Sequence, residues 1–196
     1  MVGTHTVHIY KLTCDTKWAS LAVTIMASGR MLTPVLVFKG MLAGCIAKWY
    51  FATYPYRCNY ACQSSAWMDE VVMLQWVEQV LKPHILELPL NGVPRLLLDS
   101  YRCHMMASVM QINEMGVKVQ NIPGGCTGLS QPVDIGVAKW LEDELINRWE
   151  SWMIEEEAAQ DGELPRKECI DSGKTPPPKR EKIHMWTIAA CQSIST

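Results

Sequence analysis

Short apolar runs separated by turn residues fill the first forty positions of the chain. Ala19–Ile25 and Val35–Phe38 are rich in Val, Leu, Ile and Thr, which favour extended backbone. Ala27–Arg30 lies between them and has the composition of a turn, so the pattern predicts a β-hairpin. Val7–Leu12 is a candidate for a further strand, whereas residues 40–64 have the Gly, Pro and scattered aromatic residues of a loop.

Helical spacing begins after residue 66, where the apolar positions recur every three or four residues: Val71, Leu74, Val77 and Leu81. Ser64 or Ser65 is the expected N-cap. Asp69 and Glu70 place carboxylates in the first turn, where the helix dipole stabilises negative charge. Pro83 is expected to end this helix, because proline disfavours helical backbone in the residue before it.

From residue 94 the pattern alternates between strands and helices. Pro94–Asp99 is an unbroken apolar run ending in a carboxylate, which is typical of a central strand covered on both faces. A helix is expected at His104–Met115, with Gly116 just beyond its end, and Val117–Ile122 predicts another strand. A glycine-rich loop and a long helix from Asp134 follow. This order favours an α/β fold with parallel strands.

Composition restricts the class of protein. The chain of 196 residues has a net charge of −2, no apolar run of membrane-spanning length and no signal-peptide pattern, so we expect an intracellular protein without a polybasic surface. Its 8 Cys are expected to be mostly buried, reduced thiols, and a zinc site at Cys58 and Cys62 is the weaker alternative. Residues 1–158 are expected to form one domain, and residues 159–196 a Pro/Lys-rich linker with a short C-terminal segment.

Two carboxylates lie at the ends of predicted elements. Asp99 follows the buried strand, at the carboxyl end where open α/β sheets bind ligands, and Asp134 begins the long helix. If both face one cleft, they supply the oxygen ligands that a hard divalent cation such as Mg²⁺ requires. Two local roles remain open on spacing alone. Asp134 can cap its helix, and Asp99 can accept a hydrogen bond from the following turn.

The residues around these carboxylates resemble a known family. Leu96–His104 is similar to the second-aspartate motif of DDE-superfamily transposases of the pogo, Tigger and jerky type. Ile122–Thr127 followed by Gln131–Gly136 resembles their third-acid motif, and 34 residues separate the two aspartates. Ala27–Arg30 with Pro34–Gly40, and Ala66–Glu70, match further blocks of the family in the same order. The resemblance covers roughly residues 3 to 155.

The resemblance implies an RNase H-like mixed sheet flanked by helices and a divalent-metal endonuclease acting on DNA in the nucleus. Asp99 and Asp134 would be ligands of Mg²⁺ or Mn²⁺. His104 would lie at the cleft near them and contact phosphate, and its alternative role is a local hydrogen bond at a helix start. Asp69 and Glu70 belong to a family motif too, but we interpret them as helix-start acids.

The chain also departs from the family pattern. The first catalytic aspartate of the family lies on a strand upstream of Gly3–Tyr10, so we expect a sheet without its first strand and an exposed edge prone to self-association. Asp15 lies in a turn-like context and is a poor replacement. Ala138–Leu141 replaces the usual Asn-Lys-Pro-Phe. We therefore expect a truncated core that binds DNA weakly and does not cut it.

Two further functions are alternatives to a truncated endonuclease core. A non-enzymatic nuclear remnant that binds nucleic acid or protein would be favoured if the Lys and Arg residues cluster on one face. An unrelated α/β hydrolase using Cys103 and His104 is disfavoured, because adjacent side chains point in different directions.

Overall fold

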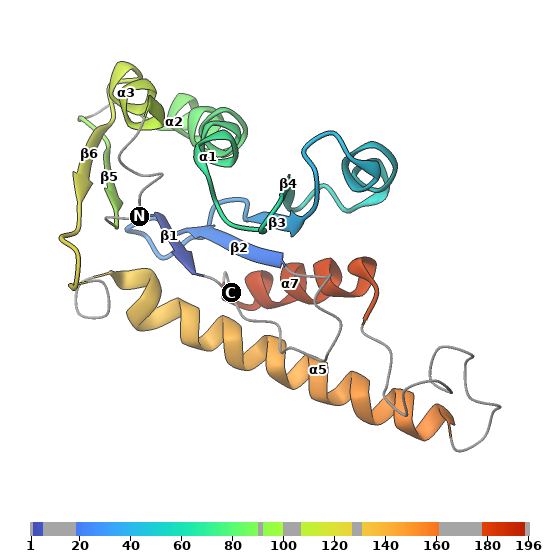
Figure 1. Cartoon of the computed structure of the whole chain (residues 1–196). Coiled ribbons are helices and arrows are strands. Elements are labelled where there is room, and N and C mark those ends of the chain that lie inside the picture. Colours follow the sequence, from blue (N-terminus) through green and yellow to red (C-terminus); the bar gives the residue numbers. More distant parts are fainter. Residues whose placement is uncertain are drawn as a thin grey trace.

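The computed structural model describes residues 2–5, 19–89, 92–99, 107–126, 131–160 and 178–194. Six of its strands form one sheet: β1 (Val2–His5), β2 (Ala19–Thr24), β3 (Val35–Lys39), β4 (Asn59–Gln63), β5 (Arg95–Leu98) and β6 (Lys118–Asn121). They lie in the order β4-β3-β2-β1-β5-β6 (Figure 1). The pairs β1–β2 and β2–β3 are antiparallel, whereas β3–β4, β1–β5 and β5–β6 are parallel. The sheet is therefore mixed, as in an RNase H-like fold.

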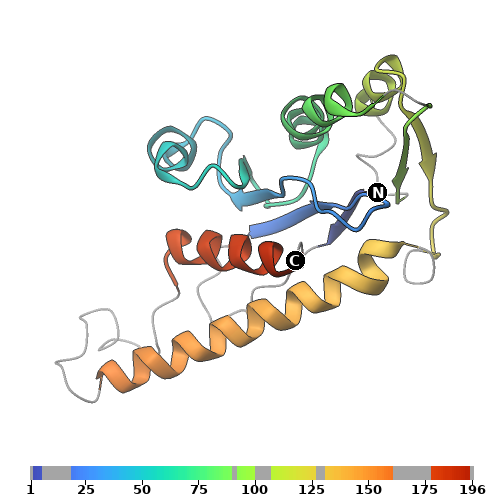
Figure 2. The same ribbon diagram turned by 180° about the vertical axis from the view of Figure 1, so that it is seen from behind.

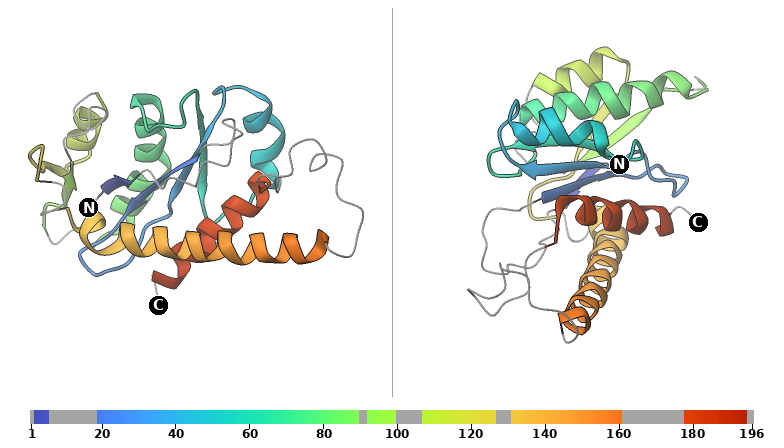
Figure 3. Two further views of the ribbon diagram at one scale, coloured as in Figure 1. Left: turned by 60° about the horizontal axis from the view of Figure 1, so that its bottom comes forward. Right: turned by 90° about the vertical axis from the view of Figure 1, so that its right-hand side faces the viewer.

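Helices cover both faces of this sheet (Figures 1 and 2). On one face lie α1 (Glu70–Trp76), η3 (Val77–Leu81), α2 (Lys82–Glu87) and α3 (Ala107–Glu114). On the other lie η5 (Val133–Ala138), α5 (Lys139–Gln160) and α7 (Arg180–Ile194). The side view in Figure 3 shows the resulting three layers. The predicted α/β class with a helix-flanked mixed sheet is confirmed.

Strand β3 shows why the central strands are apolar throughout. Val35 and Val37 pack into the core beneath α1, while Leu36 and Phe38 pack into the core beneath α5 and α7. Successive side chains of a strand point to opposite faces, and here each face is covered by helices. The predicted hairpin is thus present as β2 and β3, and Gly29 in its connection has a φ of 87°.

The predicted elements after residue 94 are present. The apolar run forms β5, the following helix is α3, and Gly116 has the positive φ of 78° expected of a residue just past a helix end. Strand β6 and the long helix α5 follow, and η5 starts the latter with a π-helical turn. The sequence pattern was sufficient here because each element carries its own local signal.

The helix that begins near residue 70 differs from the prediction at both ends. Asp69, not Ser64 or Ser65, is the N-cap, and its carboxylate accepts a hydrogen bond from the Val72 backbone N–H at 3.0 Å. Pro83 does not end the helical path, because the π-helical turn η3 precedes it and leaves it in the first turn of α2. Residues 70–87 therefore form one continuous helical path, in which the proline directly follows the π-helical turn.

Two strands were not expected. Asn59–Gln63, within the segment interpreted as a loop, forms β4 and pairs with β3 in parallel register. Val2–His5 forms β1 and lies between β2 and β5. Residues 7–12, whose edge was expected to lack a neighbour, lie outside the described residues.

Helix α7 packs onto the sheet through an aromatic cluster. Its His184 is buried, with the ring centroid 4.4 Å from that of Tyr54 and 6.0 Å from that of Tyr60. Tyr54 and Tyr60 also pack on Phe38 of β3, so the cluster joins α7 to the central sheet. Burial raises the pKa of Tyr54 to about 12 and lowers the pKa of His184 below its ordinary value. The boundary predicted at residues 158/159 stays a prediction.

Three buried cysteines lie in the same region. Cys58, Cys62 and Cys191 are free thiols, and burial raises the pKa of Cys191 to about 12. This agrees with the expectation of reduced, buried thiols. Within the described ranges no group of three or more His, Cys, Asp or Glu side chains is arranged to hold a metal ion, and none of the helices is apolar and long enough to span a membrane.

The first stability prediction concerns Trp76 of α1. Its ring is 1% exposed and its Nε1–H donates to Thr24 Oγ1 at 3.2 Å, so it joins α1 to β2. We expect Trp76→Ala to lower the free energy of unfolding by about 3–5 kcal/mol, measured by urea denaturation. Trp49→Ala is the matched control, because Trp49 is 71% exposed, and it should change stability by no more than about 0.5 kcal/mol. Equal losses in the two variants would contradict this packing.

The second concerns the pH dependence of α7 docking. Folding buries His184 in its neutral form, so the unfolded chain binds a proton at a higher pH than the folded chain does. The melting temperature should therefore be level above the ordinary histidine pKa of about 6.5 and fall as the pH drops below it. His184→Phe should flatten this fall. An unchanged slope in that variant would show that another group titrates.

Candidate metal centre

Strand β5 determines the direction of Asp99. Leu96 and Leu98 are 3% and 0% exposed and pack in the core beneath α1 and α3. Because side chains alternate along a strand, we expect Asp99, directly after Leu98, to point toward the opposite layer, which η5 and α5 form. Its side chain is partly buried. The predicted position of Asp99, at the carboxyl end of a buried strand, is confirmed.

The neighbours of β5 support its carboxyl end. Strand β1 runs parallel on one side, with Val2 beside Leu98, and β6 runs parallel on the other. The Ile122 N–H donates to the Leu98 carbonyl at 2.7 Å, which holds the chain just before Asp99. Asp99 therefore follows a strand that is hydrogen-bonded on both edges, and its backbone position is well defined.

Asp134 lies in the first turn of η5. The N-cap position is Pro132, and the Asp134 N–H donates to the Gln131 carbonyl at 3.1 Å. Val133 beside it is fully buried, and the Oδ1 atom of Asp134 is itself buried. Helix η5 contacts β1, the strand that pairs with β5. Asp134 therefore lies next to the strand that pairs with β5.

Gln131 is a buried polar residue that the sequence analysis gave no role. It is 1% exposed, and among the described residues neither its Nε2 nor its Oε1 has a hydrogen-bond partner. It directly precedes the turn that carries Asp134. The sequence signal was its place in the third-acid motif, but only burial shows that its amide is withheld from solvent. His104 and Asp15 lie outside the described residues.

Asp99 and Asp134 supply part of the ligand set that one hard divalent cation needs. Carboxylate oxygens are what Mg²⁺ and Mn²⁺ prefer, and Mg²⁺ often takes only one or two of them from the protein. Strand β1 adds no third carboxylate, since its residues are Val2, Gly3, Thr4 and His5. The register that sets Val2 beside Leu98 brings Gly3 level with Asp99. The position of β1 next to Asp99 therefore carries no carboxylate.

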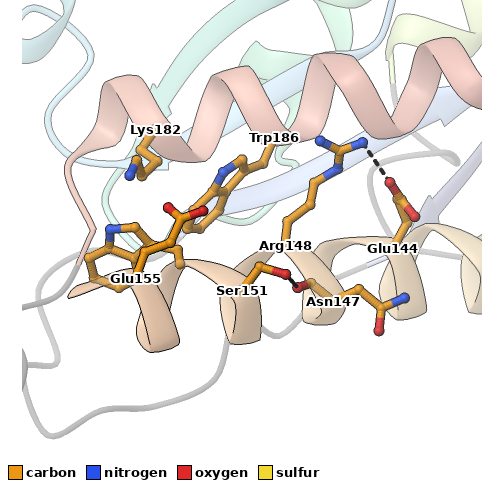
Figure 4. Close-up of a pocket in the computed structure, with 8 residues that line it drawn as sticks. Glu144, Asn147, Arg148, Ser151, Glu155, Lys182 and Trp186 are labelled. Atoms are coloured by element: carbon orange, nitrogen blue, oxygen red, sulfur yellow. Dashed lines mark hydrogen bonds and ion pairs between the residues drawn. The ribbon is translucent and has the colours of Figure 1, made fainter. Parts of the chain in front are cut away.

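A separate pocket lies between α5 and α7 (Figure 4). Its volume is about 380 Å³, and it contains neither carboxylate. Arg148 donates to Glu144 of the same helix at 2.6 Å, and the Lys182 ammonium of α7 lies 5.5 Å from the Trp152 ring centroid of α5. The contact of Lys182 with Trp152 therefore joins the two helices at this pocket.

Comparison with known proteins decides the family. The model of the DDE superfamily endonuclease matches residues 15–191, which include both carboxylates and all of the helices after them up to Cys191. The chain belongs to the DDE superfamily endonuclease family. No solved structure matches it significantly. DDE endonucleases generally use divalent metal ions and act on DNA, so the two carboxylates of this DDE domain lie in a family whose chemistry requires such groups.

Curated relatives are pogo-type proteins. The chain is 27% identical to the mouse "Pogo transposable element with KRAB domain" and 25% identical to its human counterpart, in each case over 88% of this chain. A third relative, the human "Pogo transposable element with ZNF domain", is 21% identical over 67% of the chain. The DDE domain described here spans only about a quarter (26%) of the length of the first two relatives.

The geometry leads to a prediction about the two carboxylates. If Asp99 and Asp134 share one ion, their carboxyl groups should approach to roughly 4–7 Å, the separation that one or two shared metal ions permit. A crystal structure of the chain with Mn²⁺ measures this separation and locates the ion by its anomalous signal. An ion bound elsewhere, or carboxyl groups on opposite faces of the sheet, would contradict the metal centre.

Proposed function

We propose that this chain is a DDE endonuclease domain in which Asp99 and Asp134 hold one divalent cation, Mg²⁺ or Mn²⁺, and that it does not cut DNA by itself. The observation that carries the proposal is the position of the two aspartates. Asp99 follows β5, which pairs with β1 within the sheet, and Asp134 lies in η5, which contacts the same strand. His104, which follows Asp99 by five positions, is proposed to contact phosphate at the same cleft.

The proposed inactivity follows from the chemistry of the donor set. In phosphoryl transfer a bound divalent cation stabilises the charge that develops on the phosphate oxygens. Two carboxylates hold such an ion less firmly than three, and small displacements of the reacting groups greatly slow a reaction that depends on positioning. Strand β1 carries Gly3 and Thr4 where a further carboxylate would be needed. Cation binding without turnover is the expected result.

DNA binding and location belong to the same proposal. We expect weak binding of duplex DNA that falls steeply with salt, because the net charge is −2 and phosphate contacts release counterions. A nuclear location follows from a DNA substrate. The division into a catalytic core at residues 1–158 and a linker with a short C-terminal segment at residues 159–196 is proposed as well, and α7 of the second part packs back onto the core.

A second function is that of a non-enzymatic nuclear remnant that binds nucleic acid or protein. Arg30, Lys39, Lys48 and Arg57 lie in one described segment of the sequence that has no acidic residue. Clustering of such cations on one face of the fold would favour this function. The two functions differ in one respect, since the remnant needs no cation at Asp99 and Asp134.

The activity test is a plasmid-nicking assay with Mg²⁺ or Mn²⁺. The purified chain should leave supercoiled DNA intact, because it holds at most two of the three carboxylates of the family. Cleavage that is abolished by both Asp99→Ala and Asp134→Ala would refute the proposed inactivity. Asp15 would then be the first candidate for the third ligand.

A gain-of-ligand variant tests the same proposal in the other direction. Gly3→Asp introduces a carboxylate level with Asp99, so it should tighten Mn²⁺ binding several-fold in a titration followed by electron paramagnetic resonance. Gly124→Asp, on the exposed turn after β6, is the matched control and should leave Mn²⁺ affinity unchanged. Equal effects of the two variants would show that net charge, rather than a third ligand, is responsible.

A further inference from the structure

The charges of the chain are strongly segregated, although its net charge is close to zero. Residues 16–68 contain 5 of the 18 basic residues and none of the 20 acidic residues. Four of the five cations belong to described parts of the fold, and Arg30, Lys48 and Arg57 are exposed. This half of the sheet is therefore positive, while the acidic residues lie on the helices and in the rest of the chain.

The middle of this segment forms an aromatic lobe, which we define as residues Gly40 to Cys58. It contains η1 (Ile46–Tyr50) and η2 (Phe51–Thr53), shown in cyan beside β3 and β4 in Figure 1. Its inner side packs against the core, where the Phe51 ring lies 5.7 Å from Tyr60 and the Tyr54 ring 5.0 Å from Tyr60. The lobe is therefore anchored to β4, and the direction of its outer side is fixed.

The exposed residues of the lobe include both aromatic rings and cations. Trp49 is 71% exposed and Tyr56 is 88% exposed, and Tyr50 is exposed as well. Lys48 and Arg57, each next to one of these rings in the sequence, are also exposed. Large aromatic side chains are seldom left in water without a partner, and exposed apolar groups gathered in one place mark an interaction surface. The alternation of ring and cation suits a ligand with flat bases and a charged backbone.

The lobe lies away from the carboxylates. Strand β4 is one edge of the sheet, and β5, which precedes Asp99, is four strand positions away. At the usual spacing of strands this is on the order of 20 Å. Figure 3 shows the lobe at the β4 end of the sheet and the start of the long helix, where η5 carries Asp134, at the other. The lobe is thus a second surface, which a DNA strand of moderate length can reach together with the metal centre.

We propose that the outer side of the aromatic lobe binds single-stranded DNA, with bases stacked on Trp49, Tyr50 and Tyr56 and phosphates paired with Lys48 and Arg57. The choice of DNA as the ligand rests on the proposed function. The exposed rings and the positive charge of the lobe are independent of that function. A second copy of the chain fits the lobe less well than single-stranded DNA does. A symmetric contact would bring Lys48 and Arg57 of both copies together, and the lobe has no acidic residue to neutralise them.

Charged groups of α7 act on the inner side of the lobe. Glu181 raises the pKa of Tyr54, and Arg180 beside it acts in the opposite sense on the same phenol. Tyr54 itself is buried.

The test is binding of fluorescently labelled oligothymidine of about 16 nucleotides, followed by anisotropy at low salt. The pair Trp49→Ala and Tyr56→Ala should weaken binding at least about tenfold, and Trp49→Phe should retain most of it. The pair Lys48→Ala and Arg57→Ala should weaken binding and reduce the slope of log affinity against log salt by about 1.4. All four residues are exposed, so circular dichroism and melting temperatures should match the unmodified chain.

Matched controls lie at the opposite end of the sheet. Arg95 and Lys118 are exposed and stand beside each other on β5 and β6, so the pair Arg95→Ala and Lys118→Ala removes the same charge from another place. It should leave the affinity within about twofold. Equal losses in the lobe and control variants would overturn the proposal, and so would lobe variants that bind as tightly as the unmodified chain.

Other ligands are distinguished in the same series. Tighter binding of an RNA of the same length, lobe-dependent binding to anionic lipid vesicles instead of DNA, or a dimer that the lobe variants disrupt would each overturn the assignment. Mn²⁺ titration separates this inference from the proposed function, because the lobe variants should bind Mn²⁺ as the unmodified chain does. Loss of Mn²⁺ binding alone would refute the metal centre and leave the lobe in place.

Discussion

The way β5 is held in the sheet is the constraint on which the candidate site depends. Leu96 and Leu98 are held in the core beneath α1 and α3, and the strand is paired with β1 and β6 on its two edges. With the strand fixed in this way, side-chain alternation predicts that Asp99, the first polar residue after it, points toward the layer that contains η5 and Asp134. A single slip of β5 by one position would turn Asp99 into the apolar core instead.

Elements with strong local signals could be predicted from the sequence. Unbroken runs such as Val35–Phe38 and Leu96–Leu98 indicate strands buried on both faces, and both are central strands here. Strand β4 could not be found in this way, because Asn59–Gln63 has little β-branched content and is extended only through its pairing with β3. The prediction that Pro83 ends the helix was wrong for a related reason. The π-helical turn before it, which lets the helical path continue, has no pattern that a periodicity analysis recognises.

The site was predictable to a similar extent. Asp99 and Asp134 could be singled out because they end a strand and begin a helix within recognisable motifs. Gln131 could not, since only the fold shows that its amide is buried. The place of β1 beside β5 was also beyond sequence reasoning, because a four-residue strand gains its stability from its two neighbours. The net charge of −2 gives no indication of the positive lobe, because acidic residues elsewhere in the chain offset its basic residues.

Cation binding at the two aspartates is the central claim, and one titration tests it most directly. Free Mn²⁺ is followed by electron paramagnetic resonance for the unmodified chain, Asp99→Asn, Asp134→Asn and the control Glu150→Gln, whose side chain is exposed on α5. The account predicts one weak site per chain that each of the aspartate variants weakens at least tenfold and that the control leaves intact. Unchanged Mn²⁺ affinity in both aspartate variants would contradict it.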